Sequence, residues 1–235
     1  MIRVITILFV LAGSFCQAGE LDLTQQTMAE VHVVSKAIKA VQPYLGVTKL
    51  TEYGLGIYRA SQKYDIDASV LIAIAQQETA FRENLPEGRA GEHGITQIRK
   101  MWLKQPAFKK EFKNPTIADL RRPAKSFMMA AWILRDLKDR LSAGRTLPFW
   151  SYYNANKFEN RFKYFVAVNR NLATLRRFQQ TLDAKKQLAD NTETVQAAPS
   201  RSSASIASPM GLPPAGKPSR MFWTPRQPRD IARIN

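Results

Sequence analysis

A glutamate at the end of an apolar segment is the residue best placed to do acid chemistry in this chain. Leu71, Ile74 and Glu78 are spaced three and four residues apart, so on a helix Glu78 continues the stripe that faces the core. A glycine-rich segment ending at Gly94 follows, and it can fold back over the carboxyl group. Burial raises the pKa of a carboxylic acid, so we expect Glu78 to hold its proton near neutral pH. Such a group can serve as general acid toward a leaving oxygen, as in a glycosidase.

The hydrophobic pattern predicts that helices position this glutamate. Asp67 has the short acidic side chain of a helix cap and precedes the apolar run that leads to Glu78. Pro123 is typical of a first helical turn, here in a long helix with one buried face. No segment alternates apolar and polar residues over a convincing length, so the predicted fold class is mainly α. The helices that we expect cover roughly residues 21–45, 51–63, 68–80, 95–103, 118–141 and 162–182, with a further helical piece opening at residue 148.

The two ends of the chain differ from its middle. Residues 1–18 have the basic start, short apolar core and small-residue end of a secretory signal, with cleavage expected after Ala18. Cys16 leaves with the signal, unless the protein is a lipoprotein acylated there, which the bulky Phe15 disfavours. We expect one domain over residues 19–186 and a disordered tail rich in Pro, Ser, Ala and Arg over residues 187–235. The predicted location is the periplasm or cell envelope, or outside the cell, with no transmembrane segment after cleavage.

The chain is strongly basic. It has 35 Lys and Arg residues against 19 Asp and Glu residues, a formal net charge of +16. This charge favours a polyanionic partner, and an exported protein meets anionic wall polymers and lipid head groups before it meets nucleic acid. The competing interpretation is a solvated basic surface that binds no specific partner. In the tail, Phe222 and Trp223 lie among arginines. These aromatic residues dock on a partner or an anionic surface, or, in the alternative interpretation, they have no specific role.

Three ordered motifs over roughly residues 50–177 give a more specific indication. Residues 65–68 and 73–81 resemble the helix ending in Glu-Ser-x-Phe that carries the catalytic glutamate of the bacterial soluble-type lytic transglycosylases, relatives of goose-type lysozyme. Residues 94–98 are similar to the Gly-Leu-Met-Gln turn that lines their cleft, and residues 152–156 to their Ala-Tyr-Asn-x-Gly motif. The resemblance implies a lysozyme-like helical domain with a catalytic cleft. It also implies cleavage of the β-1,4 bond between N-acetylmuramic acid and N-acetylglucosamine in peptidoglycan.

The resemblance further implies roles for particular side chains. Glu78 protonates the glycosidic oxygen and then accepts the proton of the C6 hydroxyl of the muramic acid, which leaves a 1,6-anhydro sugar. Tyr153 hydrogen-bonds near Glu78 and orients it. The residues implied in substrate binding are Ile95, Thr96, Gln97, Tyr153 and Asn154, and two tryptophans, Trp102 and Trp150, are weaker candidates for stacking on sugar rings.

The sequence also departs from the family pattern. Thr79 replaces the usual Ser, Thr96 replaces Met, and Asn156 stands where Gly is expected, which leaves the details of the substrate open. A hydrolase, unlike a lytic transglycosylase, needs a second carboxylate to activate water. Glu87 and Glu92, in the loop after the glutamate helix, are candidates for this second acid, and two solvated loop glutamates are the alternative.

Other chemistries find little support in the sequence. It contains no P-loop, no Gly-x-Gly-x-x-Gly after a strand and no Gly-x-Ser-x-Gly. The histidines are His32 and His93, too few for a zinc site, so we expect no metal and no cofactor, although His93 is in the loop that can reach the cleft. Two other classes stay open: a weakly catalytic wall-binding component of a secretion apparatus, and a nucleic-acid binder. Since only the charge favours the second, we do not expect nucleic acid as a partner.

Overall fold

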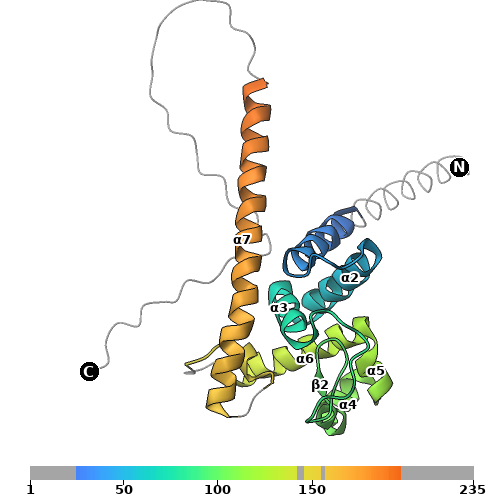
Figure 1. The fold of residues 1–235 in the computed structure, drawn as a ribbon. Coiled ribbons are helices and arrows are strands. Elements are labelled where there is room, and N and C mark those ends of the chain that lie inside the picture. Colours follow the sequence, from blue (N-terminus) through green and yellow to red (C-terminus); the bar gives the residue numbers. More distant parts are fainter. Residues whose placement is uncertain (1–24, 142–145, 155–156, 197–235) are drawn as a thin grey trace, which may run out of the picture. The chain divides into compact units, whose positions relative to one another are not determined.

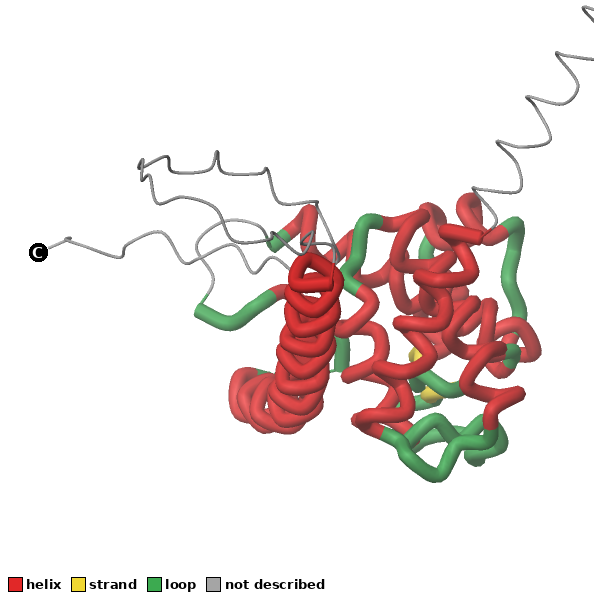
Figure 2. The backbone as a smooth tube through the Cα atoms, turned by 90° about the horizontal axis from the view of Figure 1, so that it is seen from above, coloured by secondary structure: helices red, strands yellow, loops and turns green. Residues whose placement is uncertain are grey.

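The computed structural model describes residues 25–141, 146–154 and 157–196. The predicted signal peptide, Cys16, Asn156 and residues 197–235 of the predicted tail lie outside the described residues. Residues 187–196, which we expected to be disordered as part of that tail, are helical. The described residues are mainly helical, as the sequence predicts, and their strands are confined to one short hairpin (Figures 1 and 2). In this part of the chain, every helix is too short or too polar to cross a membrane.

Residues 25–41 are helical, in agreement with the predicted first helix. Val31, Val34 and Ile38 form its buried face. The hydroxyl of Ser35 lies within hydrogen-bond distance of the carbonyl oxygen of Leu50 (3.0 Å), in the next helix. This first helix is therefore joined to the fold by apolar packing and by a polar contact.

Two successive helices, α2 (Val47–Tyr64) and α3 (Ala68–Thr79), pack against each other. Asp65 ends α2 in the left-handed conformation, and Asp67 caps α3 by accepting a hydrogen bond from the backbone N–H of Ser69 (2.9 Å). Every residue from Ala68 to Ala75 is buried, so protein surrounds most of α3 on all faces. The position of α3 is thereby fixed, and so is that of the glutamate in its last turn.

The segment predicted as one helix over residues 118–141 forms two. Helix α5 (Ile117–Arg121) is followed after one residue by α6 (Pro123–Arg140), which packs mainly against α2. Pro123 occupies the first turn of α6, as predicted. A proline also disfavours helical backbone at the residue before it, so Arg122 is extended (φ −80°, ψ 119°) and separates the two helices.

A short hairpin stands where we expected helical spacing to resume at residue 95. Strand β1 (Glu92–His93) pairs antiparallel with β2 (Ile98–Arg99), and residues 94–97 form the turn. Gly94 begins this turn with φ +76°, and a Cβ atom there would lie 1.8 Å from the carbonyl oxygen of Leu120. Only glycine permits this close approach between the hairpin and α5.

Two short helices follow the hairpin, η1 (Lys100–Lys104) and α4 (Pro106–Phe112), which the hydrophobic pattern does not distinguish. Their aromatic side chains pack with one from α6, the ring centroids of Phe108 and Trp132 being 5.3 Å apart. Trp102 and Phe112 belong to the same cluster. Apolar aromatic contacts therefore attach this segment to α6.

The last described helix, α7 (Phe158–Gln196), follows a short 3-10 helix, η2 (Phe149–Tyr152). Its buried side chains recur at intervals of four, four and three residues; they are Tyr164, Val168, Leu172 and Leu175. The helix continues to Gln196, beyond residue 182 where the sequence analysis ended it. The chain divides into two compact units after Thr181, and of the second the structure describes residues 182–196. Glu78 and the residues around it belong to the first unit.

Candidate active site

Glu78 lies in the last turn of α3 and is partly buried. Burial raises the pKa of its carboxyl group to about 7, and the negative charge of Glu92 acts in the same direction. Hydrogen bonds from Tyr164 and Asn154 and the positive charge of Arg99 lower the pKa, but by less than burial raises it. A carboxyl group with this pKa is protonated in about half of the molecules at neutral pH, so it can give a proton in one step and take one in the next.

Two side chains from distant parts of the chain hold this carboxyl group. The amide nitrogen of Asn154, just after η2, donates to both carboxyl oxygens of Glu78, at 2.9 and 3.0 Å. The hydroxyl of Tyr164, on α7, donates to Oε1 at 2.7 Å. Burial holds the pKa of the Tyr164 phenol well above its ordinary value, so it stays a donor. Tyr164 is not among the site residues predicted from the sequence, where its one signal is its place at the start of the buried stripe of α7.

Tyr153 lies close enough to Glu78 for the charge of Glu78 to act on its phenol, but its described hydrogen bond is not made to the carboxyl group, so its role in orienting Glu78 stays a prediction. The hydroxyl of Tyr153 donates instead to the backbone carbonyl of Thr96, at 3.0 Å. Tyr153 has helical backbone angles, and consecutive side chains on a helical turn point about 100° apart, so when Asn154 faces Glu78 its neighbour does not. Tyr153 therefore ties the end of η2 to the hairpin turn, and the phenol that reaches Glu78 comes from α7.

The turn residues predicted to bind sugar are mostly buried. The side chains of Ile95 and Thr96 are fully buried, and the Thr96 hydroxyl lies 2.7 Å from that of Ser126, so neither side chain offers a surface to a sugar. The carbonyl oxygen of Ile95 accepts from the Thr79 hydroxyl (2.8 Å), which fixes the turn to the end of α3. Gln97 is partly buried, and its amide donates back into the turn, so its sugar contact stays a prediction.

One candidate second acid, Glu87, makes its described contacts with residues other than Glu78. Its side chain is exposed and forms an ion pair with Lys100 (2.9 Å), which lowers the pKa of the Glu87 carboxyl group. His93, which the sequence places in a loop able to reach the cleft, has a buried side chain whose Nε2 lies 3.7 Å from a carboxylate oxygen of Glu87. The described contacts of Glu78 include neither residue.

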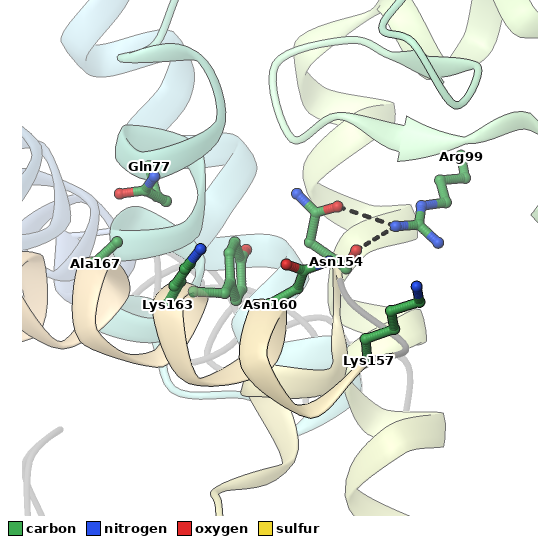
Figure 3. A pocket seen from close by; sticks show the side chains of 8 residues that line it. Gln77, Arg99, Asn154, Lys157, Asn160, Lys163 and Ala167 are labelled. Atoms are coloured by element: carbon green, nitrogen blue, oxygen red, sulfur yellow. Dashed lines mark hydrogen bonds between the residues drawn. The ribbon is translucent and has the colours of Figure 1, made fainter.

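The other candidate, Glu92, begins a series of polar contacts that leads to Glu78. Its Oε1 lies 3.7 Å from Nε of Arg99. A terminal nitrogen of Arg99 donates to the backbone carbonyl of Asn154 and, at 3.3 Å, to its side-chain oxygen, as the dashed lines in Figure 3 show. Because the guanidinium group holds the amide oxygen, the amide nitrogen faces Glu78. Arg99 thus positions Asn154, a role that an isolated arginine in a basic sequence does not reveal.

A pocket of about 690 Å³ adjoins these residues. Gln77 from α3 lies at one side of it, Lys163 and Asn160 extend from the start of α7, and Arg99 approaches from the hairpin (Figure 3). Asn154 and Tyr164, the two hydrogen-bond partners of Glu78, form part of its wall. The carboxyl group therefore lies behind the wall of a space large enough for a small ligand.

A second pocket, of about 340 Å³, shares Arg99 with the first. Trp102 and Tyr153 contribute to its lining, so Trp102 stays a candidate for stacking on a sugar ring. The same prediction for Trp150 is wrong, because that side chain is buried and stacks on Phe165 with ring centroids 5.5 Å apart. The two pockets therefore have Arg99 in common in their walls.

The comparison with known protein families agrees with the geometry. The family model for the transglycosylase SLT domain matches residues 57–181, slightly more than half of the chain. The matched segment includes Glu78, the hairpin, Asn154 and Tyr164. No curated protein matches the chain.

Proposed function

Because this chain belongs to the transglycosylase SLT domain family, we propose that it cuts peptidoglycan strands at the β-1,4 bond between N-acetylmuramic acid and N-acetylglucosamine. The family supports peptidoglycan as the substrate and a transglycosylase or lysozyme-like reaction. The observation that carries the proposal is the carboxyl group of Glu78. It has a pKa of about 7 and is held by Asn154 and Tyr164 beside a pocket.

We propose a non-hydrolytic reaction in two proton transfers. Protonated Glu78 gives its proton to the glycosidic oxygen while the bond from C1 of the muramic acid to that oxygen breaks, so N-acetylglucosamine leaves with a free hydroxyl. The carboxylate then takes the proton of the C6 hydroxyl as the C6 oxygen bonds to C1, which closes a 1,6-anhydro ring and regenerates the acid. Hydrogen bonds from Asn154 and Tyr164 stabilise the carboxylate between the two steps.

The surroundings of the two loop glutamates favour this reaction over hydrolysis. A hydrolytic base has to hold a water molecule opposite the acid. Glu87 is paired with Lys100 at the surface, and Glu92 accepts a backbone N–H at 2.9 Å and faces Arg99. Of the three candidate acids Glu78, Glu87 and Glu92, Glu78 is therefore the one whose carboxyl group is available for catalysis.

The mass of the products tests the reaction. When the purified protein cleaves a defined glycan strand, we expect each new muramic end to be one water lighter than a reducing end, as seen by mass spectrometry. Glu92→Gln should give the same anhydro product. Reducing ends from the wild type, together with their loss in Glu92→Gln, would instead identify Glu92 as the base of a hydrolase.

We propose that the protein acts in the periplasm or cell envelope, or outside the cell. The predicted signal over residues 1–18 supports export, and peptidoglycan lies outside the cytoplasmic membrane. The net charge of +16 suits a surface rich in anionic polymers.

Removing the positioning arginine should weaken cleavage and change its pH dependence. In Arg99→Gln the Asn154 amide loses its charged partner, so we expect about a tenfold lower rate. Because the charge of Arg99 and the Asn154 hydrogen bond both lower the pKa of Glu78, the alkaline limb of the pH–rate profile should move upward.

The matched control for this variant is Arg135→Gln. Arg135 pairs with Asp139 on the exposed side of α6 (2.9 Å) and does not line either pocket. The rates of both variants should be measured on the same glycan from pH 5 to pH 9. If Arg99→Gln matched Arg135→Gln in rate and in pH profile, Arg99 would not position Asn154.

A further inference from the structure

The wall of the pocket beside Glu78 is positively charged. Lys157 comes from just before α7, Lys163 from the start of α7 and Arg99 from the hairpin (Figure 3). Among the described residues that line this pocket, none is acidic. The remaining polar lining groups are amides and a phenol, from Gln77, Asn154, Asn160 and Tyr164. A neutral sugar needs hydrogen bonds and stacking surfaces, whereas a cluster of cations indicates an anionic ligand.

The two lysines are available for a ligand. Both side chains are exposed, and within the described ranges neither forms an ion pair with a carboxylate. Lysines elsewhere in the domain do form such pairs, for example Lys100 with Glu87 (2.9 Å) and Lys125 with Asp119 (2.6 Å). In the described structure, the charges of Lys157 and Lys163 are therefore not neutralised by ion pairs within the protein.

We propose that this pocket binds the carboxylates of the short acidic peptides attached to N-acetylmuramic acid, so that the enzyme prefers peptide-bearing strands to bare glycan. The inference rests on the proposed function. Each peptide is joined through the lactyl group of a muramic acid, the sugar whose C1 bond is cut, and so it emerges close to the acid. Tyr164 and Asn154 contact Glu78 and also line the pocket, so the peptide carboxylates fall within reach of the lysines.

Binding measured without turnover tests this inference. In a Glu78→Gln background, affinities should be compared for uncross-linked peptide-bearing strands and for the same strands stripped by an amidase. Adding Lys157→Gln and Lys163→Gln should weaken binding of the peptide-bearing strands about tenfold, at least five times more than it weakens binding of stripped strands. Arginines at both positions should restore the preference, and molar salt should abolish it.

The matched control is the double variant Lys109→Gln, Lys110→Gln. These two exposed lysines of α4 lie outside the pocket, and replacing them removes the same amount of charge. An equal loss on both kinds of strand, an equal loss in the control, or no loss overturns the proposal. Displacement by inorganic phosphate as effective as that by the free peptide identifies a general anion site and also overturns it. Failure of the proposed function is a separate result, because wild-type protein would then cleave neither strand.

Discussion

Glu78→Gln is expected to lower the release of glycan fragments from purified peptidoglycan about 10²–10⁴-fold, the range that a positioned general acid supplies. The amide cannot give up a proton to the leaving oxygen, yet it has nearly the same size as the carboxyl group. Its oxygen can still accept from Tyr164, which donates to Oε1 at 2.7 Å in the wild type. Fragment release should be followed by chromatography at matched protein concentration, and equal release by the two proteins would remove Glu78 from the mechanism.

The pH dependence of folding stability shows whether the Glu78→Gln protein is folded. The pKa of Glu78 is about 7 in the folded protein against an ordinary 4.5, so the folded state binds the proton more tightly than the unfolded state does. The stability that this group contributes is therefore full below pH 4.5 and is lost as the pH rises to about 7. Glu78→Gln removes this loss, so its stability relative to the wild type should increase over that window, by at most about 3 kcal/mol. This result would show that an inactive variant is folded.

Gly94→Ala should destabilise the domain by about 3 kcal/mol or more. The new Cβ atom would lie 1.8 Å from the carbonyl oxygen of Leu120 and 2.8 Å from its carbonyl carbon, backbone atoms that no side-chain rotation can move away. The φ of +76° adds strain for any residue with a Cβ atom. Urea unfolding followed by circular dichroism measures the change.

Gly46→Ala is the matched control for this substitution. Gly46 has an ordinary extended backbone (φ −67°), and a Cβ atom there meets nothing within 4 Å. We expect the stability of this variant to stay within about 1 kcal/mol of the wild type. If the two alanine variants were equally stable, the hairpin would be free to move away from α5, and Gly94 would not fix its position.

The sequence predicted those parts of the fold that depend on local pattern. The stripe through Leu71 and Ile74 correctly placed Glu78 at the end of a buried helix, the Asp67 cap is present, and Pro123 begins a helix. Each of these features depends on residues within one or two helical turns, where spacing and capping decide the structure. The hairpin was missed because its strands have two residues each, too few for an alternating pattern to be visible.

The surroundings of the carboxyl group could not be predicted in the same way. Tyr164 is 86 residues from Glu78 in the chain, and it reaches the carboxyl group because α7 runs beside α3, where Asn171 of α7 also donates to the carbonyl oxygen of Ala73 at 3.1 Å. The sequence motif pointed to Tyr153, since that residue is next to Asn154, but adjacency in sequence does not decide which side chain faces a third element. Arg99 acts through a contact with Asn154 across 55 residues, which no local pattern encodes.

The Tyr164 hydrogen bond also bears on when, during synthesis, this domain becomes capable of acid chemistry. A ribosome makes the glutamate helix long before it makes α7, and until α7 docks the carboxyl group lacks the phenol and the cover that this helix provides. In an incomplete nascent chain we therefore expect the pKa of Glu78 to lie closer to that of an ordinary solvated acid. The arrangement links the competence of the proton donor to completion of the domain.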